Sequence, residues 1–149
     1  MDERAVAEIA AWAVLAVNAV AGSFAAWRWW SVQPSDAAWP LLRAGQVAAF
    51  AQAAVAGVLF ASGYDPGDDL YWLYALLPVA IGLIAEQLRI ASAEQVLEDR
   101  DLPDAQAVGT LSEDEQRSVV LAIVRRELGV MALAALVVAF LALRAALIV

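Results

Sequence analysis

The chain has 149 residues, 63% of them hydrophobic, and a mean hydropathy of +0.68. Soluble domains are about 45–50% apolar, so this composition predicts that most of the chain lies in a membrane. It contains neither Cys nor His, which excludes disulfides, thiolate nucleophiles, imidazole bases and metal sites that need those ligands. We therefore expect no metal and no cofactor. The chain has nine basic residues, all of them arginine, and 17 acidic residues. The resulting net charge of −8 argues against a nucleic-acid partner.

Four apolar segments are long enough for a hydrocarbon core that takes about 20 helical residues to cross. They predict an all-α integral membrane protein of one domain, with four transmembrane helices in an antiparallel bundle. The expected spans are about 5–30, 37–62, 70–92 and 126–149. At the far end of the first span, Trp27, Trp29 and Trp30 surround Arg28, a pattern typical of the headgroup boundary.

Small residues recur at helical spacing and predict close contacts between helices, within the chain or between copies. The expected packing residues are Asn18, Gly22, Gly45, Ala49, Ala53, Gly57, Gly82, Ala132, Ala135, Ala139 and Ala142. In the second span the small residues repeat every four positions, whereas in the last span they alternate between three and four. Asn18 is expected to form a hydrogen bond at a close crossing of helices.

The third helix is expected to continue into water. Residues 70–99 would extend ~45 Å as a helix, against a hydrocarbon thickness of ~30 Å. Ser112 and Glu115 have the spacing of a capping box, which predicts the start of a helix that continues without a break into the last span. The third and fourth helices should therefore project together as a helical hairpin, about 93–125.

The arginines predict the orientation. With both termini outside, seven of the nine lie on the cytoplasmic side, as the positive-inside rule favours, and the hairpin is cytoplasmic. High Ala and Arg content without Lys is typical of GC-rich bacterial genomes. The expected location is thus a bacterial inner (plasma) membrane.

A polar cluster is expected near the inner headgroup boundary. Arg43, Glu86 and Arg125 reach similar depths when each helix is measured from its outer end, and Gln46 and Arg89 lie close to them. A carboxylate at that depth stays ionised when it is paired with Arg. Three interpretations remain open: an ion pair that fixes helix register, a transport or catalytic site, and a site for anionic lipid headgroups.

Abundant packing surface with sparse chemistry favours a non-enzymatic accessory, assembly or scaffold protein. Its expected partners are membrane lipids, other membrane subunits or further copies of itself, and a cytoplasmic protein at the acidic segment 94–115. One alternative is a small oligomeric transporter or channel that uses Glu86 with Arg43 and Arg125. Another is a protein that binds a lipid or a quinone. No recognisable catalytic grouping predicts an enzyme.

Overall fold

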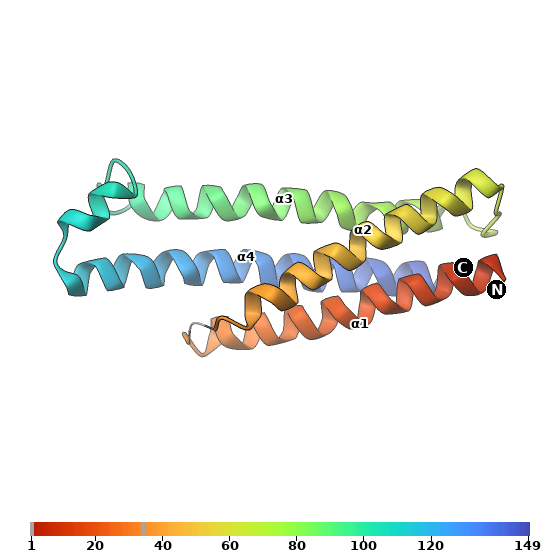
Figure 1. Cartoon of the computed structure of the whole chain (residues 1–149), viewed down its shortest axis with the longest axis horizontal. Helices are drawn as coiled ribbons and strands as arrows, with labels where there is room; N and C mark the ends of the chain where they lie inside the picture. Colours follow the sequence, from red (N-terminus) through yellow and green to blue (C-terminus); the bar gives the residue numbers. More distant parts are fainter. Residues whose placement is uncertain (1, 34) are drawn as a thin grey trace.

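A computed structural model describes residues 2–33 and 35–149 and shows an all-helical chain (Figure 1). The helices are α1 (Glu3–Trp30), α2 (Ala38–Ser62), α3 (Leu70–Glu98) and α4 (Glu113–Ile148), with a short 3₁₀ helix, η1 (Gln106–Thr110), before α4. Helix accounts for 84% of the residues, and the described part of the chain contains no strand. The four long helices are each long and apolar enough to cross a membrane.

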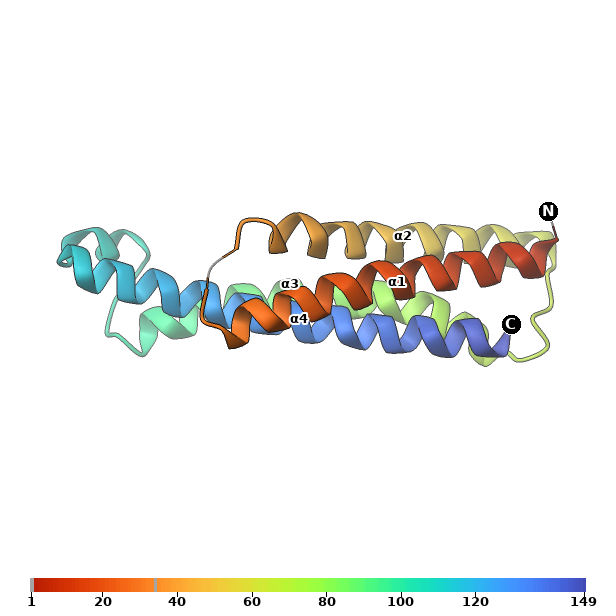
Figure 2. The ribbon, with the colours of Figure 1, turned by 90° about the horizontal axis from the view of Figure 1, so that it is seen from below.

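The four helices form a ring in which α1 packs on α2 and α4, and α3 packs on α4 and, less extensively, on α2. The start of α1 and the end of α4 lie at one end of the molecule, and η1 lies at the other (Figure 1). Beyond the connection between α1 and α2, only α3 and α4 continue, side by side, as the hairpin expected from their length (Figure 2).

The capping box at the start of α4 is confirmed. The Ser112 side chain accepts a hydrogen bond from the Glu115 amide, and the Glu115 carboxylate accepts one from the Ser112 amide at 3.0 Å. Within the hairpin, Arg126 pairs with Asp99 at 3.2 Å, so an exposed ion pair joins its two helices.

The core of the bundle follows an alternating spacing of three and four residues. Because this spacing averages 3.5 residues, it keeps one face of each helix against its neighbours along a gentle left-handed supercoil. Most of the positions hold Ala or Gly, which allows the backbones to approach closely. On α1 the buried residues in this register are Ala7, Ala11, Val14, Asn18, Ala21 and Ala25; on α2 they are Leu42, Gly45, Ala49, Gln52, Ala56 and Leu59.

Only the first part of the four-residue repeat expected on α2 packs against other helices of the chain. Gly45 and Ala49 are buried, Ala53 is half-buried, and Gly57 is exposed. Each step of four residues turns the helix by about 400°, so the stripe drifts by about 40° per step and leaves the core. Gly82 on α3 likewise takes no part in close packing within the chain, because a Cβ there would meet nothing within 4 Å.

The other expected packing residues lie in close contacts. Asn18 donates from Nδ2 to the carbonyls of Val14 and Gly45, at 3.0 and 3.1 Å, so its side chain joins α1 to α2. A Cβ on Gly22 would lie 2.9 Å from Leu136 Cγ on α4. Four small residues of α4 are buried in the bundle: Ala132, Ala135, Ala139 and Ala142.

Replacing Gly45 by Val should destabilise the bundle. A Cβ at this position would lie 2.5 Å from Asn18 Oδ1, so the helices must separate or the Asn18 hydrogen bonds must break. Overpacking of this kind costs about 1–3 kcal/mol. The measurement is the midpoint of thermal unfolding in a mild detergent. Gly57→Val is the matched control, since a Cβ there meets nothing within 4 Å. Equal midpoints for the two variants would contradict the assigned contact.

Candidate functional site

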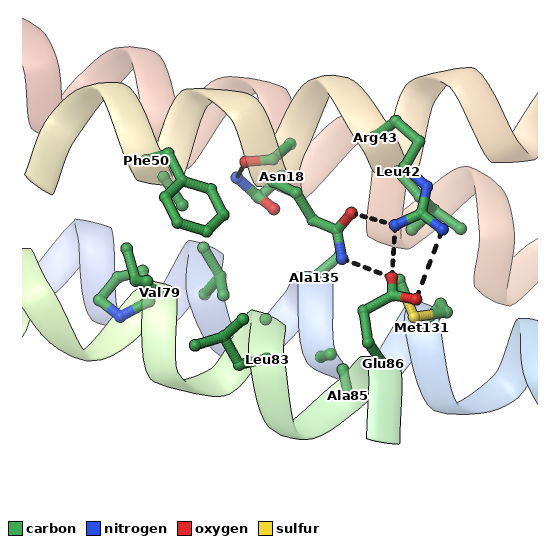
Figure 3. Close-up of a pocket in the computed structure, with 17 residues that line it drawn as sticks. Asn18, Leu42, Arg43, Phe50, Val79, Leu83, Ala85, Glu86, Met131 and Ala135 are labelled. Atoms are coloured by element: carbon green, nitrogen blue, oxygen red, sulfur yellow. Dashed lines mark hydrogen bonds and ion pairs between the residues drawn. The ribbon is translucent and has the colours of Figure 1, made fainter. Parts of the chain in front are cut away.

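A cavity of about 180 Å³ lies between α2 and α3, which pack less extensively on each other than α2 packs on α1 or α3 on α4 (Figure 3). Residues of α2 and α3 form its two sides, and Asn18 of α1 and residues of α4 close it from behind. The space exists because small residues meet here: Ala49 on α2, Gly82 and Ala85 on α3, and Ala134 and Ala135 on α4. We refer to this cavity as the crevice.

The lining of the crevice is mostly apolar. Met131 and Val138 of α4 lie at its back, and Pro78 and Val79 of α3 lie along one side. Two bulky residues of the lining, Phe50 of α2 and Leu83 of α3, are 53% and 58% exposed. Side chains that border the cavity and also face outward form its rim, so the crevice opens sideways between α2 and α3.

The crevice has one polar end, which is built around Glu86. Its Oε1 accepts hydrogen bonds from Arg43 Nη1 and from Gln46 Nε2, the latter at 2.9 Å (Figure 3). Arg43 Nη1 also donates to Gln46 Oε1 at 2.6 Å, and Arg43 Nη2 lies 3.4 Å from Glu86 Oε2. One carboxylate of α3 is therefore held by two side chains from successive turns of α2.

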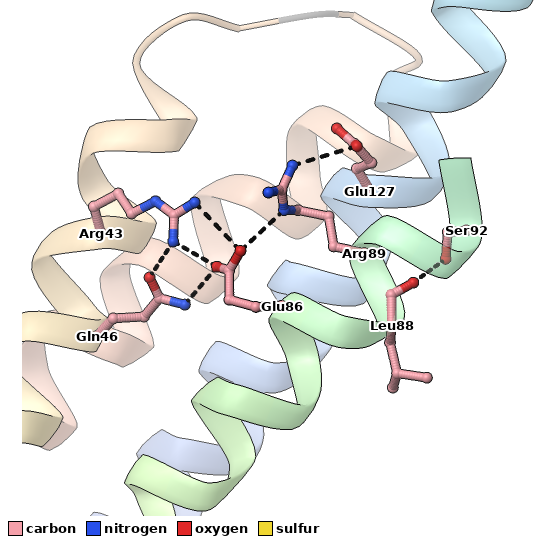
Figure 4. Close-up of polar contacts among 7 residues, drawn as sticks. All are labelled: Arg43, Gln46, Glu86, Leu88, Arg89, Ser92 and Glu127. Atoms are coloured by element: carbon pink, nitrogen blue, oxygen red, sulfur yellow. Dashed lines mark hydrogen bonds and ion pairs between the residues drawn. The ribbon is translucent and has the colours of Figure 1, made fainter. Parts of the chain in front are cut away.

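The ionic contacts continue from Glu86 to α4 (Figure 4). Arg89 Nε donates to Glu86 Oε2 at 3.1 Å, and Arg89 Nη1 donates to Glu127 Oε1 at 3.4 Å. The Arg89 guanidinium also lies 5.8 Å from the ring centre of Trp39 on α2. Two arginines and two glutamates thus form a chain of neutral overall charge that links three helices.

The structure brings together four of the five polar residues expected from the sequence: Arg43, Gln46, Glu86 and Arg89. The fifth, Arg125, is not part of the cluster. It is exposed, and its guanidinium lies 5.6 Å from the ring centre of Trp29 on α1. Each residue turns an α-helix by about 100°, so the side chains of Arg125 and Glu127 point in nearly opposite directions. Glu127 therefore faces α3, while Arg125 faces α1.

Sequence reasoning missed Glu127 as a member of the cluster. The signal that would have found it is its distance of four residues from Met131, which places it on the buried face of α4. Gln52 of α2 is buried with no hydrogen-bond partner for its side chain among the described residues. No three acidic side chains of the described chain gather in a way that would hold a metal ion.

The size of the crevice limits what it can hold. Its volume of about 180 Å³ is close to that of an engineered apolar cavity of ~150 Å³ that binds benzene. Pockets that enclose a drug-sized molecule have volumes of about 300–1,000 Å³. The crevice therefore has room for one ring or for a segment of a hydrocarbon chain.

No protein-family model matches this chain, and no significant match is found among curated proteins or solved structures.

Replacing Glu86 by Gln should lower the stability of the bundle. The change leaves Arg43 without its carboxylate partner and removes one of the two partners of Arg89. Hydrogen bonds to charged groups contribute about 1.5–3 kcal/mol, and we expect a loss of that order in thermal unfolding in detergent. Arg126→Gln, which breaks the exposed pair with Asp99, is the control and should cost at most about 1 kcal/mol. A Glu86→Gln protein as stable as that control would show that the cluster contributes little.

Proposed function

We propose that the four helices cross a bilayer as an antiparallel bundle. Arg125 and Arg144 of α4 are nineteen residues apart, or ~28 Å along the helix, and this matches a hydrocarbon core of ~30 Å. Aromatic rings lie at the depth of each of these two arginines: Trp29 lies beside Arg125, and Tyr74 lies beside Arg144. Paired belts of this kind are typical of the two headgroup layers.

Further, the distribution of arginines supports an orientation with the hairpin in the cytoplasm of a bacterium and both termini outside. Five arginines lie around the level that would meet the inner headgroups, with all four helices contributing: Arg28, Arg43, Arg89, Arg125 and Arg126. Only Arg4 and Arg144 lie at the opposite end of the spans. The positive-inside rule relates such an asymmetry to the cytoplasmic side.

In this setting the protein's function is to bind an amphiphilic molecule of the bilayer in the crevice, without catalysis. The observation that carries this proposal is the shape and polarity of the crevice: an apolar cavity that opens sideways between two helices and ends at Arg43, Gln46 and Glu86. A ligand that enters from the lipid would place a hydrocarbon segment against Met131 and Val138. Its head would remain at the polar end.

The polar end favours a head group that accepts hydrogen bonds. Arg43 is 49% exposed, whereas Glu86 is 24% exposed and already accepts from three side chains. A guanidinium has five N–H donors, and among the described residues Arg43 directs them to only two partners, Gln46 and Glu86. Phospholipid phosphates and quinone carbonyls share this accepting chemistry, and the mass of the bound molecule distinguishes them.

The transporter hypothesis receives less support from the geometry. Glu86 is held by Arg43, Gln46 and Arg89, and the charges of the cluster balance. A carboxylate that carries an ion needs oxygens that are free to bind the ion, or a proton that it can exchange. The crevice opens sideways between α2 and α3, so it offers no path from one end of the bundle to the other. The accessory-subunit hypothesis stays a prediction, and a bundle that binds lipid is compatible with it.

Filling the crevice should remove the bound amphiphile. Gly82→Leu adds a side chain where a Cβ meets nothing within 4 Å, at a position that lines the cavity. Lipids extracted from the purified protein are quantified by mass spectrometry, and we expect about a tenfold lower amount of one co-purifying species, equivalent to ~1.4 kcal/mol.

Gly57→Leu is the control for that measurement. A Cβ on Gly57 of α2 also meets nothing within 4 Å, and Gly57 does not line the crevice. The Gly57→Leu protein should therefore retain the wild-type amount of the co-purifying species. Retention of the same species at the same level by Gly82→Leu would overturn the crevice as its site.

The orientation can be tested because the chain has no cysteine of its own. Single cysteines replace Ala105, beside η1, and Asp69, whose side chain does not cap α3. In intact cells a membrane-impermeant maleimide should label only Asp69→Cys, whereas Ala105→Cys should react only after permeabilisation. The reverse pattern would invert the proposed topology.

A further inference from the structure

A second depression lies away from the crevice, where the end of α1 meets α4. It is small, about 20 Å³, and open to one side of the molecule. The end of α1 and the residues that follow it supply Arg28, Trp29 and Gln33, while α4 supplies Leu121, Val124 and Arg125. Because α2 and α3 contribute no lining residue, this site is separate from the one built around Glu86.

Two arginines from different helices border this depression. Arg28 Nη1 donates to Gln33 Oε1 at 3.2 Å, which joins the end of α1 to the segment that follows it. Arg125 lies against the face of Trp29, with 5.6 Å between its guanidinium carbon and the ring centre. A cation held over an aromatic ring keeps its N–H groups free at the ring's edge for an anion.

The charge of Arg125 is not balanced within the described chain. Three other arginines near this level each pair with a carboxylate: Arg43 with Glu86, Arg89 with Glu86 and Glu127, and Arg126 with Asp99. None of the ion pairs found across residues 2–33 and 35–149 includes Arg125, and no acidic residue lines the depression. The depression is therefore bordered by the unbalanced charge of Arg125 in an otherwise acidic protein.

We propose that this depression binds the phosphate of an anionic phospholipid in the cytoplasmic leaflet. Guanidinium groups bind phosphate oxygens through paired hydrogen bonds, and Arg125 would bind the phosphate at this depression, which Arg28 also borders. Leu128, which lies about one turn from Arg125 on the side of the proposed hydrocarbon core, gives the site an apolar edge for the glycerol and the first carbons of the chains. Trp27 and Trp30, both exposed, add indole rings at the headgroup depth.

This inference rests on the proposed placement of the bundle in a membrane but not on the crevice. A free phosphate ion would share the chemistry of the arginines and would gain nothing from the apolar edge or the tryptophans. A phospholipid uses all three features, and negatively charged lipids are abundant on the cytoplasmic face of membranes, where basic clusters bind them. The ligand of this site is therefore the lipid headgroup.

The test uses the full chain in nanodiscs that contain phosphatidylglycerol and phosphatidylcholine in equal amounts. Lipids that remain bound after gentle release of the protein are counted by native mass spectrometry. Wild type should retain phosphatidylglycerol in preference to phosphatidylcholine, and Arg125→Gln should reduce that preference by about tenfold. Arg126→Gln is the matched control, because it removes the same charge from the neighbouring residue, which faces Asp99. It should leave the preference unchanged.

Several outcomes would overturn this inference alone. One is equal retention of the two lipids by the wild type; another is an equal loss in Arg125→Gln and Arg126→Gln, which would indicate only a general effect of charge. Binding of inorganic phosphate to protein in pure phosphatidylcholine nanodiscs, abolished by Arg125→Gln, would assign the site to a free anion. Arg125 and Arg126 do not line the crevice, so the difference between their two variants reports on this site alone, whereas the species lost in Gly82→Leu reports on the crevice. Failure of the crevice proposal is thereby distinguished from failure of this one.

Discussion

Close approach of four helices through small residues is the constraint on which the rest of the structure depends. Ala and Gly at alternating three-residue and four-residue spacing allow the backbones to approach, as at Gly45, where the carbonyl accepts a hydrogen bond from Asn18. In a bilayer, where lipid tails are as apolar as the side chains, such contacts replace the hydrophobic effect as the source of association. The same residues create the crevice, because Gly82 and Ala135 leave space where larger side chains would fill it.

Much of this architecture could be predicted from the sequence, because long apolar helices and the Ser112 capping box are encoded by neighbouring residues. The membership of the polar cluster was harder to predict. Glu86 and its partners on α2 and α3 followed from depth along each helix, but depth does not determine which side of a helix a residue occupies. Arg125 and Glu127 differ by only two positions and face different neighbours. For a related reason, the repeat that ends at Gly57 packs only in part within the chain, since a spacing of four residues departs from the bundle's 3.5-residue register.

Arg43, Arg89 and Arg125 differ in how their charges are balanced. Arg43 and Arg89 are neutralised by Glu86 and Glu127, and their hydrogen bonds join helices that otherwise pack through small apolar residues. Removing one member leaves others without a partner, so this group contributes chiefly to the register of α2, α3 and α4. Arg125 has no such partner and is held by an aromatic ring. An unbalanced charge at the surface adds little to folding, and it remains available to a ligand of opposite charge.

The position of the crevice follows from the order of contacts around the ring. The pairs α1–α4 and α3–α4 pack most extensively, so α4 anchors both of its neighbours, while α2 and α3 meet less closely. At the polar end, Glu86 with Arg43 and Gln46 bridges this gap, and toward the middle of the helices it stays open. The proposed ligand would enter between α2 and α3, the least extensively packed neighbours of the ring, and would lie against α4. Because the contacts of Arg43 and Gln46 with Glu86 join α2 to α3, they would oppose a wider separation of these helices, and the volume of about 180 Å³ suits a slender chain or a single ring.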